Sequence, residues 1–265
     1  MNISAVVVTY NEERRLSECL QGLSFCEDVT VVDLGSQDDS TQIASRFGAS
    51  VVVHEWVPTI EMIRSKLIQF AQNDWIIMID PDEVFDSRIY AEIIKHQQIL
   101  DQSAIICIPT KYYFLGNELK TTIWGQKHLR KQFIFHRKRV YFSSDVHGGA
   151  STLNGFQMWN IPLHDGLHIK HYWIDSIAQL FEKHRRYIER EGEARYNQGQ
   201  RYNLLHCITH VIRVLRQNLI TLKGVFGGWR GIFLSFFHGW YEMQSLLSLK
   251  KHEKKKIKNE NIRIN

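Results

Sequence analysis

A short run of apolar residues, Trp75–Ile79, ends abruptly in Asp80, Pro81, Asp82 and Glu83. The run has no charged residue and is rich in β-branched side chains, which is typical of a strand buried on both faces of a parallel sheet. Open α/β sheets bind their ligands at the carboxyl ends of such strands. The pattern therefore favours an α/β fold with a binding site at that edge.

Predicted strands and helices alternate through the first part of the chain. The pattern indicates strands at 3–9, 29–33 and 50–53, and helices after them at 16–23, 40–47 and 60–71. Further strands are predicted at 103–109, 131–137 and 166–173, a hairpin at 112–120, and a helix at 175–191. Alternation with short connections predicts a mostly parallel, doubly wound sheet flanked by helices.

Polar residues collect where three of these strands end. The clusters are Thr9, Asn11 and Glu12; Asp33, Ser36 and Asp38; and Asp80, Asp82 and Glu83. The chain has neither a GxGxxG motif nor a GxxxxGK[ST] motif at these places, which argues against a dinucleotide fold and a P-loop. A carboxylate after the second strand suits ligand hydroxyls or the N–H of a base.

Asp80 and Asp82 would project to the same side if their backbone is extended. Two hard oxygen ligands on one side suit Mg²⁺ or Mn²⁺ held against a diphosphate. The alternative is an acidic cap for the helix predicted from Ser87 onward, since Asp favours helix N-termini.

The clusters together resemble a known family. Val8-Thr9-Tyr10-Asn11-Glu12, the segment 31–41 and Ile79-Asp80-Pro81-Asp82-Glu83 are similar to motifs of the family 2 glycosyltransferases. More narrowly, the chain resembles the lipopolysaccharide-core and cell-surface glucosyltransferase-like branch, which the segments 181–188 and 239–242 also resemble. The resemblance implies the GT-A fold and an inverting, metal-dependent hexosyltransferase. Its donor would be a sugar linked to a nucleoside diphosphate, and we expect a UDP-sugar.

The resemblance also implies roles for the matching residues. Thr9, Tyr10 and Glu12 would line the base and ribose, Asp33 would contact the uracil or the ribose, and Ser36 and Asp38 would flank it. Arg64 would face the phosphates, Asp80 would contact the ribose or the metal, and Asp82 would be the principal ligand of Mg²⁺ or Mn²⁺.

Two histidines, His168 and His171, lie in the predicted strand at 166–173. In extended backbone they point to opposite faces, so a zinc centre is not predicted. The resemblance allows one histidine here to approach the diphosphate or its metal, and His171 is the candidate. The alternative is a buried structural histidine.

The general base is where the sequence departs from the branch, which usually has Val-His-Glu. Here the chain reads Asp145-Val146-His147-Gly148, so Gly148 replaces the natural candidate base. Asp145 and His147 are the remaining candidates for deprotonating the acceptor hydroxyl. The alternative is that His147 orders a loop and Asp145 caps it.

The last part of the chain is aromatic and basic. The segments 204–222 and 226–249 are apolar but interrupted by charges such as Arg213, Arg216 and Arg230, so no spanning helix is predicted. Amphipathic helices of this kind fit an anionic membrane face. The alternative is a helical hairpin that packs on the sheet domain or forms a homo-oligomer.

We predict a GT-A domain at 1–200, a helical extension at 201–250 and a basic tail at 251–265.

Composition sets the outer limits. A net charge of +5 and the absence of a nucleic-acid-binding motif favour an anionic substrate or membrane over DNA or RNA. The four cysteines show no CxxC spacing, so we expect free thiols in a reducing compartment. The first strand begins at once, so we expect no signal peptide. Together with the aromatic and basic last part of the chain, these features predict a cytoplasmic protein that is peripheral on the inner membrane face. The acceptor would be an envelope saccharide or a lipid-linked saccharide. The other function classes are a sugar-phosphate nucleotidyltransferase and a non-catalytic nucleotide-sugar-binding scaffold.

Overall fold

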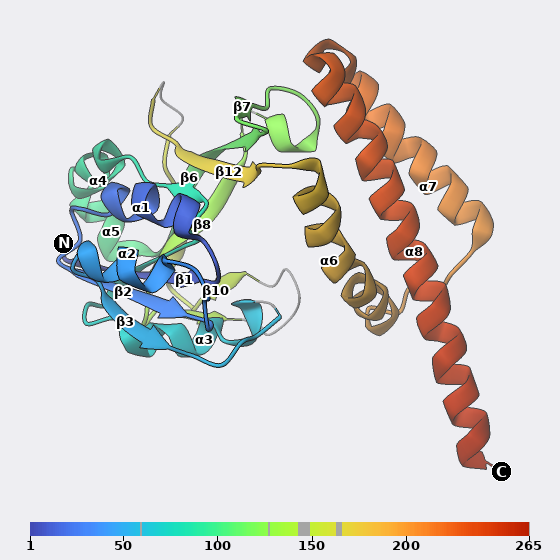
Figure 1. The fold of residues 1–265 in the computed structure, drawn as a ribbon, viewed down its shortest axis with the longest axis horizontal. Coiled ribbons are helices and arrows are strands. Elements are labelled where there is room, and N and C mark those ends of the chain that lie inside the picture. The colour runs from blue at the N-terminus through green and yellow to red at the C-terminus, as the bar shows by residue number, and fades with distance from the viewer. Residues whose placement is uncertain (59, 127, 143–148, 163–165, 265) are drawn as a thin grey trace. The chain divides into compact units, whose positions relative to one another are not determined.

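The apolar runs of the sequence form a ten-stranded sheet in the order β3-β2-β1-β4-β8-β6-β12-β5, with β7 and β11 pairing to β6 (Figure 1). This computed structural model describes residues 1–58, 60–126, 128–142, 149–162 and 166–264. The strands are β1 (Ile3–Thr9), β2 (Asp28–Asp33), β3 (Ser50–Val53), β4 (Trp75–Ile79), β5 (Glu83–Val84), β6 (Ser103–Phe114), β7 (Asn117–Glu118), β8 (Arg130–His136), β9 (Val140–Phe142), β10 (Ala150–Thr152), β11 (Gln157–Asn160) and β12 (Ile169–Ile174).

The first four strands are parallel to one another, as the alternation of strands and helices predicts. β1 lies between β2 and β4, and β2 pairs with β3. Every residue of β1 is buried, because helices or strands cover both of its faces. Beyond β4 the sheet becomes mixed, since β8 is antiparallel to both β4 and β6. The predicted α/β fold class is confirmed.

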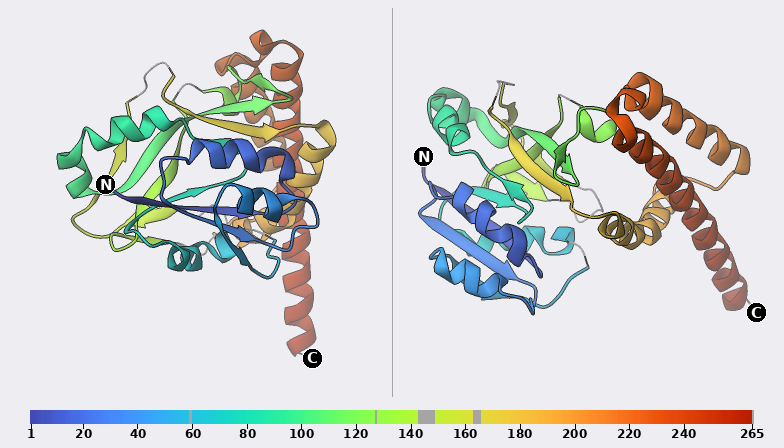
Figure 2. Two further views of the ribbon diagram at one scale, coloured as in Figure 1. Left: turned by 60° about the vertical axis from the view of Figure 1, so that its left-hand side comes forward. Right: turned by 45° about the horizontal axis from the view of Figure 1, so that its top comes forward.

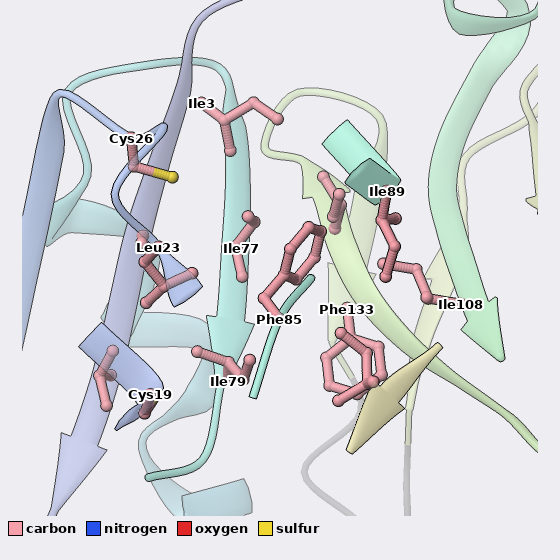
Figure 3. Close-up of a cluster of buried hydrophobic side chains, with 14 of the residues drawn as sticks. Ile3, Cys19, Leu23, Cys26, Ile77, Ile79, Phe85, Ile89, Ile108 and Phe133 are labelled. Carbon is pink, nitrogen blue, oxygen red and sulfur yellow. The ribbon is translucent and has the colours of Figure 1, made fainter. Parts of the chain in front are cut away.

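The helices of this part are α1 (Glu13–Gly22), α2 (Ser40–Arg46), α3 (Arg64–Leu67), α4 (Ser87–Ile94) and α5 (Gln97–Gln102). α1 buries Leu16, Cys19 and Leu20 at helical spacing. The core that they enter also receives Ile77 and Ile79 from β4 and Phe133 from β8 (Figure 3). This packing fixes the strand ends from which the polar clusters project.

One predicted helix has a different structure. The segment 60–71 forms two 3₁₀ turns, Ile60–Met62 and Ile68–Phe70, on either side of the single turn of α3. Its apolar residues Ile63 and Leu67 are buried as expected. Apolar spacing alone does not distinguish an α-helix from a chain of shorter turns that buries the same side chains.

The chain divides into two compact units. The first comprises Met1–Lys111 and His128–Trp173, and the second comprises Tyr112–Lys127 and Ile174–Asn265. This division differs from the predicted boundaries at 200 and 250, which stay a prediction. The strands β6 and β12 each have residues in both units.

The second unit is mostly helical, with α6 (Ile177–Asn197), α7 (Leu204–Arg216) and α8 (Gly228–Ile264). α7 lies alongside α8 (Figure 2). Ser176 is the N-cap of α6, since its side chain accepts the Gln179 N–H, and Asn203 caps α7 in the same way. The segment 251–264, which was predicted to be a tail, continues α8. Among the described residues, no helix has the length and apolar character that a membrane span requires.

Candidate active site

Asp33, the last residue of β2, is only 2% exposed. Its Oδ2 accepts the backbone N–H groups of Gly35 and Ser36, each at 3.0 Å. Gly35 has a φ of +87°, which lets the chain fold back over the carboxylate. The other carboxylate oxygen of Asp33, Oδ1, is buried and has no hydrogen-bond partner among the described residues. A buried carboxylate oxygen of this kind needs a donor, and a ligand N–H or hydroxyl could supply it.

The loop after β1 is held against the loop after β2. The Asn11 N–H donates to Ser36 Oγ at 2.9 Å, and Asn11 Oδ1 accepts the Gln37 N–H at 2.8 Å. The Glu12 N–H donates to Ser40 Oγ at 2.9 Å. Asn11 has a φ of +56°, in the left-handed region that Asn tolerates. These bonds join the first two predicted clusters into one surface.

Three predicted donor-binding residues lie on or beside this surface. Thr9 is buried, and its hydroxyl has no hydrogen-bond partner among the described residues, whereas Tyr10 is exposed. Asp38 accepts the Glu13 N–H and the Ser40 N–H, both at 3.0 Å. Partial burial alone would raise the pKa of Asp38, but these bonds and one from the Ser40 hydroxyl outweigh it and lower the pKa. The Asp38 carboxylate thus ties the start of α1 to the start of α2.

The acidic segment after β4 is a turn, not the extended backbone that the sequence suggested. The Glu83 N–H donates to the Asp80 carbonyl at 3.0 Å, and the Asp80 N–H donates to Glu83 Oε2 at 3.2 Å. Pro81 fits a turn because its φ is fixed. Asp80 and Asp82 therefore point to different neighbours, Asp80 toward Lys131 and Asp82 toward His171.

Glu83 lies at the centre of this turn and is 1% exposed. Its Oε1 forms an ion pair with Lys131 Nζ from β8 and lies 3.4 Å from His171 Nδ1 of β12. Burial raises the pKa of Glu83, and the positive charge of Lys131 and the nearby His171 oppose that rise. The β5–β12 pairing, which places His171 opposite Glu83, builds this contact into the sheet.

His171 lies between two carboxylates. Its Nε2 is 3.3 Å from Asp82 Oδ2, and its Nδ1 faces Glu83. A carboxylate behind an imidazole is the arrangement that orients metal-bound histidines. Asp82 Oδ2 and His171 Nε2 could together hold a divalent cation, which would need further oxygen ligands from a diphosphate and water. Within the described part of the chain, no group of three or more His, Cys, Asp or Glu side chains could hold a metal alone.

Arg64 lies beside the same cluster. A small cavity of about 40 Å³ is lined by Arg64, Asp80, Glu83 and Lys131 together with apolar residues of β1, β4 and β8. Two cations and two carboxylates therefore meet at the carboxyl end of β4. Positive charge at this place is suited to the oxygens of a phosphate.

A wider cavity, of about 420 Å³, lies between α1, the start of α4 and β12. Glu18, Gln21, Asp86, Arg88, His168 and Lys170 are among its lining residues. Asp86 already accepts hydrogen bonds from Arg88. The predicted site residues do not line this cavity, so its larger volume does not make it the stronger candidate.

Lys131 and Glu83 were not among the predicted site residues. Lys131 lies in a segment that alternates polar and apolar residues, which usually indicates an exposed polar face. Glu83 itself was a signal in the sequence. It is the third carboxylate after a buried strand, and a carboxylate buried at such a place needs a cationic partner. The candidate bases Asp145 and His147, with Gly148, lie outside the described residues.

The sequence matches the family model of glycosyl transferase family 2 over residues 4–155. The chain belongs to this family. An uncharacterised glycosyltransferase of Rickettsia typhi is 26% identical over 225 residues, which cover 79% of this chain and 73% of the relative. The prophage-derived glycosyltransferase SunS of Bacillus subtilis is 26% identical over 113 residues, which cover 42% of this chain and 27% of SunS.

Two solved structures are partly similar to this chain. S. aureus TarS has a TM-score of 0.48 and 15% identity, covering 73% of this chain and 39% of TarS. Glucosyl-3-phosphoglycerate synthase from Mycobacterium tuberculosis, solved with Mn²⁺, UDP and glucosyl-3-phosphoglycerate, has a TM-score of 0.47 and 16% identity, covering 71% of this chain and 78% of the synthase.

Proposed function

We propose that this family 2 glycosyltransferase is inverting and metal-dependent, and that it takes its sugar from a UDP-linked donor. The observation that carries the proposal is the buried Oδ1 of Asp33, which has no hydrogen-bond partner among the described residues and lies at the same sheet edge as Asp82. β1 lies between β2, which ends at Asp33, and β4, which Asp82 follows, and is parallel to both, whereas His171 comes from β12. A base-binding oxygen and a cation-binding pair at one edge fit the two ends of a nucleoside diphosphate.

Each end of the donor has its own residues. Asp33, with Thr9, Tyr10, Glu12, Ser36 and Asp38 around it, would bind the base and ribose. Arg64 and Asp80 would lie toward the diphosphate, with Lys131 beside them. Asp82 and His171 would hold Mg²⁺ or Mn²⁺, which when bound neutralises charge on the departing diphosphate.

The acceptor hydroxyl requires a base in an inverting reaction, and Asp145 and His147 remain the proposed candidates. For the acceptor we propose an envelope saccharide or a lipid-linked saccharide, as in lipopolysaccharide biosynthesis, reached from the cytoplasmic side of the inner membrane. The support is the family resemblance together with the aromatic and basic composition of the segment 204–250.

The test incubates the full chain and Mn²⁺ with UDP-, GDP- and ADP-linked hexoses, in the presence and absence of an envelope glycolipid extract. We expect UDP release that depends on the metal and increases with the extract. With pyrophosphate added, formation of a nucleoside triphosphate and a hexose 1-phosphate instead would identify a nucleotidyltransferase. Tight donor binding with no release under any condition would identify a non-catalytic scaffold.

A further inference from the structure

α7 exposes apolar side chains along one side. Leu205, Ile208 and Ile212 follow one another at helical spacing and are 70%, 49% and 59% exposed. The opposite side of α7 carries the buried residues Cys207 and Val214. A helix of a globular protein normally turns its apolar side to the core, so a second, exposed apolar side indicates a binding surface.

The turn between α7 and α8 and the start of α8 continue this exposure. Ile220 and Phe226 are 69% and 82% exposed, and Trp229, Ile232 and Phe236 form an exposed row at the start of α8. Lys223 and Gly228 both have positive φ values, +57° and +61°, so the turn is held in a defined shape. An exposed Phe and Trp beside a fixed turn are side chains that lipid interfaces favour.

Each apolar row continues along its helix toward a close contact between α7 and α8. Ile208, Ile212 and Leu215 lie on one stripe of α7, and Ile232, Phe236 and Gly239 lie on one stripe of α8. The stripes meet where a Cβ atom at Gly239 would lie 3.0 Å from Leu215 Cδ2. We call the exposed apolar residues of α7, of the turn and of the start of α8 the α7–α8 face.

The charge of this segment has one sign. From 201 to 241 the sequence contains Arg201, Arg213, Arg216, Lys223 and Arg230 but no Asp or Glu. Arg213, Arg216 and Lys223 are exposed. A surface of apolar side chains with cations beside them complements an anionic lipid headgroup layer over an acyl layer.

We propose that the α7–α8 face binds the surface of an anionic lipid membrane. The inference extends the proposed function, because it names the surface that would bring the enzyme to a lipid-linked acceptor. A second copy of the chain is a poorer occupant, since a two-fold contact would place this face against itself, with cations opposing cations and no carboxylate to pair with them.

The first test is sedimentation of the full chain with vesicles. We expect binding to vesicles of equimolar phosphatidylglycerol and phosphatidylcholine, little binding to phosphatidylcholine alone, and release by salt, because screening acts over about 8–10 Å at physiological ionic strength. No binding to the anionic vesicles at low salt would overturn the proposal. Equal binding to both kinds of vesicle would also overturn it.

Matched variants locate the surface. R213Q/R216Q should bind anionic vesicles roughly 30-fold more weakly, whereas R213K/R216K, which keeps both charges, should bind as the wild type does. I220S/F226S should also weaken binding, and V53S/W56S, which changes exposed apolar residues of the first unit, should not. Wild-type binding by R213Q/R216Q and I220S/F226S would overturn the assignment.

Two further measurements separate the outcomes. If I220S/F226S instead converts a solution dimer into a monomer, the face is a self-association surface and the membrane proposal is wrong. Titration of the same proteins with UDP and Mn²⁺ reports the donor site alone. In the wild type, UDP binding without vesicle binding would overturn the membrane proposal and leave the proposed function standing, and vesicle binding without UDP binding would do the opposite.

Discussion

The two carboxylate oxygens of Asp33 have different environments, and the difference predicts a phenotype. Oδ2 holds its own loop through Gly35 and Ser36, whereas Oδ1 is buried without a partner among the described residues. Asp33→Asn keeps the size but removes the charge that would accept a ligand N–H. A hydrogen bond to a charged group contributes about 1.5–3 kcal/mol, so UDP should bind roughly 10–100-fold more weakly.

Calorimetric titration with UDP and Mn²⁺ measures this change. Asp86→Asn is the matched control, because Asp86 caps α4 and pairs with Arg88 away from the sheet edge, and its UDP affinity should equal that of the wild type. Unchanged affinity in Asp33→Asn would remove Asp33 from the donor site.

Asp82 carries the metal part of the proposal. Asp82→Ala should lower turnover by about a thousandfold or more, since a cation on the leaving diphosphate supplies several kcal/mol. Excess Mn²⁺ should not restore activity, and Mn²⁺ binding measured by electron paramagnetic resonance should weaken in the same variant. Wild-type turnover in the presence of EDTA would contradict a metal role, whatever the variant does.

Lys131 compensates the buried charge of Glu83. Lys131→Met would leave that carboxylate without its strongest cationic neighbour, and we expect the free energy of unfolding to fall by about 3 kcal/mol. K131M/E83Q should recover most of the loss, because glutamine removes the charge and can still accept the Asp80 N–H. Urea unfolding measures both. A fall of the same size in the double variant would show that packing of the Lys131 stem, not charge compensation, is what stabilises the turn.

At the scale of the elements, the strands could be predicted and several local shapes could not. The buried runs of β1, β2 and β4 are continuous in the sequence, so periodicity finds them and their polar ends. The turn at 80–83 depends on Glu83 reaching Lys131 and His171, which lie 48 and 88 positions further along the chain. Such long-range contacts leave no local periodicity, which is why Lys131 was missed and the acidic segment was expected to be extended.

α6 contains a histidine that should make the protein sensitive to acid. His184 packs edge-on against Phe237 and Tyr241 of α8, and burial lowers its pKa from 6.5 to about 4. A group whose pKa is depressed by folding contributes stability that is present above pH 6.5 and is lost as the pH falls toward 4, because the unfolded chain binds the proton first.

Thermal unfolding at pH 7 and pH 5 tests this expectation. The wild type should lose on the order of 2 kcal/mol between the two values through His184, and His184→Gln should lose correspondingly less. Comparing the pH dependence of stability in the two proteins removes the contribution of other groups. One such group is Glu242, whose pKa of about 2 means that its contribution to stability is lost only at lower pH. Parallel pH dependence in the two proteins would show that His184 does not titrate in this range.

At the scale of the whole molecule, the chain passes between its two compact units at 111–112, 127–128 and 173–174. A single boundary between two continuous segments cannot describe these units, because each unit is built from two separate ranges of the chain. The hairpin within Tyr112–Lys127 belongs with the helices. Phe114 is fully buried and packs on Phe233 of α8, and the Ile123 N–H donates to Asn218 Oδ1 at 3.1 Å.

This topology predicts how the protein can be shortened. A chain ending at Trp173 should be poorly soluble, because the hairpin loses the helices that bury Phe114. Pro109 pairs with Arg130, and the Thr110 N–H bonds to the Leu129 carbonyl at 2.9 Å, so positions 111 and 128 face each other across an antiparallel pair. Replacing 112–127 by Asn-Gly, which favours a two-residue hairpin turn, should therefore close the strand pair and restore solubility.

The shortened chain with the Asn-Gly turn should bind UDP and Mn²⁺ with the affinity of the full chain, because every described residue proposed for the donor site lies in the first unit. It should not bind anionic vesicles, because it lacks the α7–α8 face. Size-exclusion chromatography followed by titration calorimetry measures both properties. A soluble, folded product without UDP affinity would show that the donor site needs residues of the second unit, which would move part of the proposed machinery into the helical region.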